Sequence, residues 1–348
     1  MRNYKDHLIL EDAQVKSALR ALDKLAADAI LFVVTAQGKL LGSLTDGDVR
    51  RGLIKEYSLE NKVTDFIQKN PKYLTKHDYS IRDIIRLREA NLKVIPVLDG
   101  EGIVCNVINF RVLKSYLPVD AVIMAGGRGS RLQPLTDTVP KPLLKVGDKA
   151  IIDHNVDRLR KFGVDDFWLS LRYLGEQLQN HYGNGESRGV NMHYVWENEP
   201  LGTIGAVGNI DNFEHEVILL TNSDILTTLD YEDFYLDFLE TNADMSVVTI
   251  PYQVDVPYAV METDNNLVKS FIEKPTYTYY SNGGIYLIKR DVLKKIPKNT
   301  LFNATDLMEQ LLVDGGKLVS YPMRQYWLDI GRHDDLKKAQ EDIKHLSL

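Results

Sequence analysis

Residues 125–144, AGGRGSRLQPLTDTVPKPLL, combine three glycines and three prolines with two arginines and a lysine, directly after the strand-like run AVIM. Gly126, Gly127 and Gly129 have no Cβ atom, so their backbone N–H groups can approach an anion closely. In open α/β sheets ligands gather at the carboxyl ends of strands, which is where this loop begins. The stretch therefore predicts a phosphate-binding loop on an α/β sheet, against the alternative of a surface turn with a few solvated charges.

Fixed positive charge lies within the same loop. Arg131 can offer a planar fork of hydrogen-bond donors, and Lys141 holds a compact charge between two prolines. Two familiar nucleotide motifs are excluded. GRGSRL lacks the third glycine of a dinucleotide fingerprint, and no GxxxxGK[ST] P-loop occurs in the chain. Phosphates must therefore be held here by a different arrangement.

The composition is that of an ordinary globular protein. The chain has 348 residues, so two domains are expected. Hydrophobic residues make up 44% and charged residues 26%, values that permit a sizeable core. A formal net charge of −7 argues against broad nucleic-acid binding, which relies on a basic surface. Any anionic ligand must therefore be met by locally concentrated cations.

Several features predict a cytoplasmic protein. The start, MRNYKDHLILEDAQ, lacks the apolar core of a signal peptide, and no apolar run is long enough to span a membrane. Cys105 is the only cysteine, which excludes an intrachain disulfide and favours a reducing compartment. The eight histidines show no HExxH or similar spacing, so zinc chemistry has no support in the sequence.

The first 117 residues contain an internal repeat. Residues 17–55 predict a helix, the strand ILFVV, a Gly turn, a second strand and a polar helix, and residues 80–117 repeat that order with VIPVL, the turn DGEG and IVCNVI. The pattern resembles a tandem pair of cystathionine-β-synthase (CBS) domains, with GSLTDGDVRR as its most specific part. The resemblance implies a module that often binds adenine nucleotides and associates in pairs, and hence a homo-oligomer.

The resemblance also implies a regulatory nucleotide site. Thr45 and Asp48 would hydrogen-bond a ribose, and Arg111 of the other half is a candidate for the phosphate of the same ligand. The alternative is that Thr45 and Asp48 only cap a helix. Ile108 and Arg111 stand at the corresponding positions of the second half, which departs from the pattern and argues against a second site.

After the short junction YLPVD at 116–120, the sequence from residue 121 predicts alternating strands and helices. We predict two closely placed domains, 1–117 and 118–348, the second an α/β domain with a Rossmann-like mixed sheet covered by helices. The strand candidates are AVIMAGG at 121–127, the end of 151–171, NMHYVWE at 191–197, EVILLTNSDIL at 216–226, MSVVTIPY at 245–252, NGGIYLIKR at 282–290 and LVSYPM at 318–323.

The string GGRGSRLQPLTDTVPKPLLKV closely resembles the signature of sugar-1-phosphate nucleotidyltransferases, also called nucleotide-sugar pyrophosphorylases. The resemblance runs from about residue 119 to 345. The further landmarks LGTIGAV, LLTNSDIL, FIEKP, NGGIYL and YWLDIG follow in the family's order. The resemblance implies a glycosyltransferase-A-like fold. It also implies that the glycine loop binds phosphates.

Residue roles follow from the same resemblance. Arg131 would hold the leaving pyrophosphate and Lys141 the α-phosphate, while Asp224 and Asp329 would hold Mg²⁺ (taken singly, either aspartate could merely cap a turn). The implied nucleotide-binding residues are Ala125, Gly126, Gly127, Gly129, Gly202 and Thr203. The implied sugar-phosphate-binding residues are Glu273, Lys274, Asn282 and Gly283.

The implied reaction is transfer of a nucleotidyl group from a nucleoside triphosphate to a sugar 1-phosphate, with release of pyrophosphate. A short transferase without a C-terminal β-helix resembles bacterial guanylyltransferases of surface-glycan pathways, which favours GTP. Mannose 1-phosphate, a heptose 1-phosphate and glucosamine 1-phosphate all remain open as acceptors. Two other readings also remain: a cytidylyltransferase acting on phosphocholine, and a nucleotide sensor with an inactive transferase domain.

Overall fold

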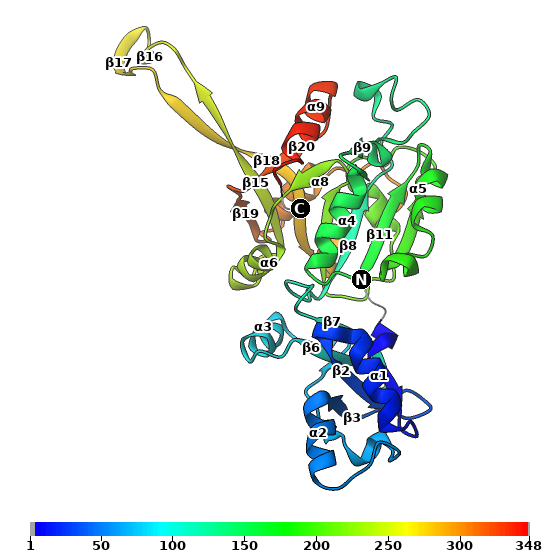
Figure 1. The fold of residues 1–348 in the computed structure, drawn as a ribbon. Helices are drawn as coiled ribbons and strands as arrows, with labels where there is room; N and C mark the ends of the chain where they lie inside the picture. The colour runs from blue at the N-terminus through cyan, green and yellow to red at the C-terminus, as the bar shows by residue number, and fades with distance from the viewer. Residues whose placement is uncertain (1–3, 347–348) are drawn as a thin grey trace. The chain divides into compact units, whose positions relative to one another are not determined.

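The computed structural model of the chain describes residues 4–346, which divide into two compact units (Figure 1). The first unit holds the chain up to Pro118 together with Leu159–Asp165 and Asn184–Asn191. The second unit holds the rest of the chain from Val119 onward. Within the described part of the chain, every helix is too short or too polar to cross a membrane.

Two small sheets form the frame of the first unit. Its strands are β1 (Leu8–Leu10), β2 (Ile30–Val34), β3 (Leu40–Thr45), β4 (Gln68–Lys69), β5 (Leu74–Thr75), β6 (Val94–Leu98) and β7 (Val104–Asn109). One sheet has the order β1-β2-β3-β4 and the other β5-β6-β7. In each, the first pair is parallel and the next is antiparallel. The helices of this unit are α1 (Val15–Leu25), α2 (Asp46–Ile54) and α3 (Ile81–Glu89).

The apolar spacing of α1 explains why this segment is a helix that packs on a sheet. Val15, Ala18, Leu22 and Leu25 recur at intervals of three or four residues, lie on one face and are buried. They pack with β2 in one core cluster. Burying one side chain of the size of Leu22 contributes about 1.5–3 kcal/mol. The predicted helix, strand, turn and strand are confirmed in both repeats.

The sequence predicts a helix after the second strand of the second repeat, and this prediction is wrong. The chain makes a single turn after β7, in which the backbone N–H groups of Val112 and Leu113 donate to the Asn109 carbonyl. The turn does not continue, because the N–H of Lys114 donates to the carbonyl of Lys161 at 2.6 Å instead. The backbone here is satisfied by a segment distant in sequence rather than by its own turn.

A seven-stranded mixed sheet lies at the centre of the second unit, in the order β12-β11-β8-β13-β18-β15-β19 (Figure 1). Its strands are β8 (Val119–Met124), β11 (Asp166–Leu171), β12 (Asn191–Trp196), β13 (Val217–Asn222), β15 (Met245–Asp255), β18 (Thr276–Lys289) and β19 (Leu318–Pro322). β8 lies parallel between β11 and β13, while β18 is antiparallel to β13 and β15. The predicted mixed α/β sheet is confirmed.

Helices and short strand pairs complete the second unit. The helices are α4 (Ile151–Lys161), α5 (Gly175–Tyr182), α6 (Tyr231–Glu240), α7 (Arg290–Leu293), α8 (Ala304–Val313) and α9 (His333–Asp342). The paired short strands are β9 (Lys145–Val146) with β10 (Lys149–Ala150), β14 (Ile225–Thr227) with β20 (Trp327–Asp329), and β16 (Val260–Asp264) with β17 (Leu267–Ile272). A large core cluster gathers buried side chains of β8, β13, β15, β18 and α8.

Candidate active site

The glycine loop begins where the buried strand β8 ends. Gly129 has a φ of +64°, and a Cβ atom there would lie 2.9 Å from Cβ of Lys141 and 3.1 Å from Cγ2 of Thr136. Both the backbone conformation and the close packing therefore require glycine at this position. Gly129 leads into a single 3₁₀ turn (Ser130–Leu132) that carries Arg131, and a second such turn begins at Lys141.

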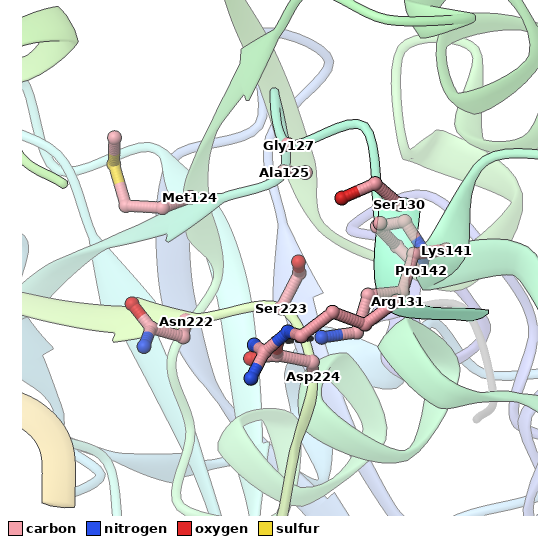
Figure 2. A pocket seen from close by; sticks show the side chains of 11 residues that line it. Met124, Ala125, Gly127, Ser130, Arg131, Lys141, Pro142, Asn222, Ser223 and Asp224 are labelled. Atoms are coloured by element: carbon pink, nitrogen blue, oxygen red, sulfur yellow. Dashed lines mark hydrogen bonds and ion pairs between the residues drawn. The ribbon is translucent and has the colours of Figure 1, made fainter. Parts of the chain in front are cut away.

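A cavity of about 270 Å³ lies over the carboxyl ends of β8 and β13. Its lining residues are Met124, Ala125, Gly127, Gly129, Ser130, Arg131, Lys141, Pro142, Asn222, Ser223 and Asp224. Figure 2 shows the side chains of Arg131 and Lys141 extending from the loop toward Asp224, which follows β13. The ligand end of the sheet is therefore the place where the loop cations and an acidic side chain meet.

A second cavity of about 250 Å³ shares Asn222 with the first. Its lining residues are Asn222, Ile225, Asn282, Gly283, Gly284, Tyr286, Trp327 and Asp329. In the β14–β20 pair, Ile225 lies opposite Asp329. The N–H of Ile330 donates to the Asp224 carbonyl at 3.0 Å. This short ladder brings Asp224 and Asp329 together, although they are far apart in the sequence.

The surroundings of the two carboxylates, Asp224 and Asp329, favour binding of a cation. Burial, and next the negative charge of Asp224, raise the pKa of Asp329 to about 6, and the charges of Lys141 and Arg131 only partly offset this. Lys141 donates to Oδ2 of Asp224. Oδ1 of Asp224 and Oδ1 of Asp329 are buried and accept no hydrogen bond from the described residues. The pair therefore offers two unused carboxylate oxygens beside fixed positive charge.

A family model for nucleotidyl transferases matches residues 120–345, the region that forms this sheet and both cavities. The chain belongs to the nucleotidyl transferase family. Two curated relatives carry guanylyltransferase names. The mannose-1-phosphate guanylyltransferase of Mycobacterium tuberculosis is 30% identical over 232 residues, which cover 65% of this chain and 64% of that protein. The D-glycero-alpha-D-manno-heptose 1-phosphate guanylyltransferase of Aneurinibacillus thermoaerophilus is 27% identical over 230 residues, 65% of this chain and 99% of that protein.

A solved structure has a similar fold. HddC from Yersinia pseudotuberculosis superposes with a TM-score of 0.51 at 27% identity, covering 65% of this chain and 99% of HddC. A second structure of HddC is complexed with GMP-PN and gives a TM-score of 0.50. The chain spans less than two thirds of the length of the mycobacterial relative, whereas it covers nearly all of the heptose enzyme and of HddC.

Two predicted nucleotide contacts of this nucleotidyl transferase are engaged elsewhere. Oγ1 of Thr203 accepts a hydrogen bond from the N–H of Ala304 at 2.8 Å, and the N–H of Thr203 donates to Oδ1 of Asn303. A Cβ atom at Gly202 would lie 2.7 Å from the carbonyl oxygen of Phe302. The turn thus satisfies the amino end of α8, and neither residue lines the two cavities.

The structure does not bring Glu273 and Lys274 to the cavities. Both are exposed and lie between β17 and β18, and neither lines either cavity. The other two predicted sugar-phosphate residues, Asn282 and Gly283, line the second cavity together with Asp329. The structure therefore places two of the four predicted sugar-phosphate residues, Asn282 and Gly283, in the cavity of Asp329. The other two lie outside both cavities.

Sequence reasoning missed Glu197, a buried carboxylate directly after β12. Ser170 Oγ donates to one of its oxygens, and the N–H of Leu201 donates to the other at 3.1 Å. A Cβ atom at Gly126 would lie 2.6 Å from Oε1 of Glu197. Gly126 is therefore a glycine because this carboxylate lies against its backbone. The available signal was an acidic residue that ends a strand and stands just before the LGT turn.

Two of the predicted regulatory residues of the first unit, Thr45 and Asp48, form a helix cap. Oγ1 of Thr45 donates to Oδ2 of Asp48 at 2.6 Å, and the two residues form a reciprocal capping box at the start of α2. Asp48 also pairs with Arg51. Nε of Arg111 lies 3.3 Å from Oδ1 of Asp28. The capping alternative therefore describes the observed contacts, and Arg111 lies in an ion pair of its own.

A second acidic cluster lies at the other end of the sheet from the cavities. Asp120, Asp166 and His215 are buried near the amino ends of β8, β11 and β13, with potential ligand atoms within 4.8 Å of one another. The N–H of His215 donates to Oδ2 of Asp120 at 2.8 Å. Linear spacing could not reveal this cluster, because its members meet only through the parallel pairing of the strands.

Proposed function

We propose that this chain transfers a nucleotidyl group from a nucleoside triphosphate to a sugar 1-phosphate, giving a nucleotide sugar and pyrophosphate. One observation carries the proposal: a glycine loop with two fixed cations faces two carboxylates at the carboxyl edge of a mixed sheet. Membership of the nucleotidyl transferase family and the guanylyltransferase relatives support it.

The attacking group in this reaction needs no base from the protein. A sugar phosphate has a second pKa of about 6, so it is mostly ionised at neutral pH. The chain has to bring two polyanions into line and stabilise the charge that develops between them. Arg131 would hold the leaving pyrophosphate with its planar fork, and Lys141 the α-phosphate. Asp224 already fixes the Lys141 ammonium in place, so its charge is preorganised.

Asp224 and Asp329 fit a Mg²⁺ ion. Their unused, buried oxygens are the hard ligands that Mg²⁺ prefers. A cation between them would stabilise the charged form of Asp329, whose pKa is raised by burial and next by the negative charge of Asp224. When bound, Mg²⁺ supplies charge neutralisation at the phosphate oxygens. Asn222 lines both cavities and so belongs both to the cavity of the loop and to the cavity of Asp329.

We propose GTP as the nucleotide donor. Several curated relatives are named guanylyltransferases, among them the mycobacterial and the heptose enzyme, and an HddC structure is complexed with GMP-PN. Glu197 gives this preference a physical basis. Guanine presents two adjacent N–H donors, and a carboxylate oxygen can accept a second hydrogen bond beside the one that each oxygen of Glu197 accepts now. Uracil and thymine present a carbonyl where guanine has its amino group, and a buried carboxylate would repel it.

Glu197→Gln is therefore expected to lower kcat/KM with GTP by about tenfold to a hundredfold, the range for losing a hydrogen bond to a charged group. Glu199→Gln is the matched control, because Glu199 is exposed two residues further along the same loop. Thermal melting checks the fold of both variants. Unchanged kcat/KM for GTP in a stable Glu197→Gln protein would remove Glu197 from base selection.

One panel of pyrophosphate-release assays identifies the acceptor and distinguishes the alternative functions. Pyrophosphate release is measured with four nucleoside triphosphates against mannose 1-phosphate, a heptose 1-phosphate, glucosamine 1-phosphate and phosphocholine. We expect release with GTP and at least one sugar 1-phosphate. Release only with CTP and phosphocholine would establish the cytidylyltransferase reading. A folded protein that binds nucleotide but releases nothing with any pair would be a sensor.

We also propose that residues 1–117 are a CBS-domain pair that regulates the transferase at 118–348 and associates with other copies. Each half carries the order parallel strand, helix, strand, turn and antiparallel strand, which supports the repeat. Thr45 and Asp48 would then exchange their mutual hydrogen bond for the ribose of a regulatory nucleotide, with Arg111 near its phosphate.

A matched pair of variants tests the regulatory site. Asp48→Ala and Asp83→Ala each remove one capping box, at α2 and at α3, and each is expected to cost about 1 kcal/mol of helix stability. Only Asp48→Ala is expected to abolish binding of AMP or ATP outside the active site, as measured by calorimetry. Equal binding by both variants, or no binding by the parent protein, would leave Asp48 as a helix cap alone.

A further inference from the structure

A two-stranded arm extends from the sheet of the second unit (Figure 1). It comprises residues 251–280: the outer ends of β15 and β18, followed by the β16–β17 hairpin at its tip. The β15–β18 ladder continues without a break from Thr249 opposite Asn282 to Asp255 opposite Thr276. Beyond Thr249 and Asn282 the outer edges of both strands have no neighbouring strand among the described residues. Such a ribbon is at best marginally stable alone in water.

One face of the arm is mainly aromatic, and the other is mainly polar apart from Tyr280, which lies opposite Pro251. Successive residues of a strand point to opposite faces, so the cross-strand pair Tyr252–Tyr279 shares a face with Val254–Tyr277. The opposite face carries Gln253 beside Thr278 and Asp255 beside Thr276. This alternation is typical of a strand with one covered face. Yet Tyr252 is 62% exposed and Tyr279 is 59% exposed.

The apolar surface of the arm is large enough for a stable interface. Its exposed large hydrophobic side chains are Tyr252, Val254, Tyr258, Met261, Leu267, Val268, Phe271, Ile272, Tyr279 and Tyr280. An aromatic side chain alone can bury about 150–250 Å². Counted over both faces of the arm, these side chains offer on the order of 1,000 Å², whereas a standard interface needs about 800 Å² from each partner.

Charge connects the arm with the active site. Lys274 lies on the arm eight residues before Asn282, which lines the second cavity. At about 3.3 Å per residue, the six steps along β18 from Thr276 to Asn282 span about 20 Å. Lys274 lies beyond this end of the strand and lines neither cavity of its own chain. Asp329 lines the second cavity, and its Oδ1 atom is buried and accepts no hydrogen bond from the described residues. The same cavity would also receive a phosphate. A cation on the arm therefore suits a cavity of this kind in another molecule.

We propose that the arm docks on a second copy of this chain and that two copies exchange arms. The partner's Lys274 then enters the second cavity, beside Asp329, and binds the phosphate of the sugar substrate there. Because each chain carries one arm and one cavity, reciprocal exchange closes a symmetric dimer and exposes no further arm. The role of Lys274 toward the substrate rests on the proposed function, whereas the exchange of arms does not.

Complementation within a dimer tests the exchange. Lys274→Ala and Asp329→Asn are co-expressed with different tags, and heterodimers are purified through both tags. Each variant alone is expected to be nearly inactive. In the heterodimer one site combines an intact Asp329 with an intact Lys274 from the other chain, so about half of the wild-type rate is expected. No recovery in the heterodimer, or full activity of Lys274→Ala alone, would overturn the proposal. Lys269→Ala, exposed on the same arm, is the control.

The arm can also be tested without activity. Replacing Tyr252 and Tyr279 together with Ser is expected to abolish cross-linking between Lys274→Cys on the arm of one chain and Asn282→Cys in the second cavity of another chain. The polar-face variant Thr278→Ser should leave this cross-linking unchanged. If an arm with Tyr252 and Tyr279 intact does not cross-link to the cavity of another chain, the exchange is wrong even when the wild-type enzyme is active. If it cross-links but no substrate pair reacts, the dimer stands and the proposed function falls.

Discussion

Asp224→Asn is expected to reduce turnover by about a thousandfold while the protein stays folded. Asn keeps the volume of the side chain but removes the charge that fixes Lys141 and would hold Mg²⁺ with Asp329. Loss of metal-assisted charge stabilisation is worth several kcal/mol, and each 1.36 kcal/mol corresponds to about tenfold in rate. The measurement is kcat over a Mg²⁺ titration, with circular dichroism melting as the check on folding.

The matched control for this substitution is Asp148→Asn, because Asp148 is exposed in the turn between β9 and β10. Its turnover should equal that of the wild type. A folded Asp224→Asn protein that turns over near normally at saturating Mg²⁺ would show that the carboxylate pair is not the metal site. Partial recovery of the variant at high Mg²⁺ would instead agree with weakened metal binding.

Arg131→Lys is expected to lower kcat/KM for the nucleoside triphosphate by roughly a hundredfold. A lysine keeps the positive charge but cannot reproduce two parallel hydrogen bonds to a phosphate. The guanidinium of Arg131 also lies against Gly331, where a Cβ atom would be 3.3 Å from Nη2. Contact with Gly331, two residues after Asp329, holds the guanidinium in one orientation. A lysine at position 131 would not make this contact.

Arg128→Lys is the control for this second substitution. Arg128 belongs to the same loop, but its guanidinium lies over the ring of Tyr173 at 5.5 Å and does not line the cavity. We expect Arg128→Lys to lose less than a few fold in kcat/KM. If Arg131→Lys and Arg128→Lys have the same small effect, Arg131 is only a charge at the surface of the loop.

The strands and the glycine loop could be predicted because their signals are local. The apolar run before Gly126 is buried as β8, and the left-handed conformation at Gly129 requires a residue without Cβ. The carboxylate pair was inferred from resemblance rather than from spacing. Asp224 and Asp329 come together only through the pairing of β14 with β20, and no local sequence pattern predicts this pairing.

Other features of the site depend on contacts between residues far apart in the chain. The hydroxyl of Thr203, in a loop that resembles a nucleotide contact, accepts a hydrogen bond from the N–H of Ala304 at the start of α8. Glu197 was overlooked because its significance depends on the backbone of Gly126, far away in the chain. The arm was overlooked for a different reason. The alternation in TYTYY was present in the sequence, but where the arm leaves the sheet is decided by the ends of β13 and β19.

Phosphorus NMR of one reaction mixture tests the central claim most directly. Wild-type enzyme, Mg²⁺, GTP and mannose 1-phosphate or a heptose 1-phosphate are followed together, with Asp329→Asn in a parallel sample. We expect equal amounts of pyrophosphate and a guanosine diphosphate sugar to form in the wild-type sample and almost none in the variant. Formation of GDP and inorganic phosphate, of free GMP with pyrophosphate, or of the same product by Asp329→Asn would contradict nucleotidyl transfer at this pair of carboxylates.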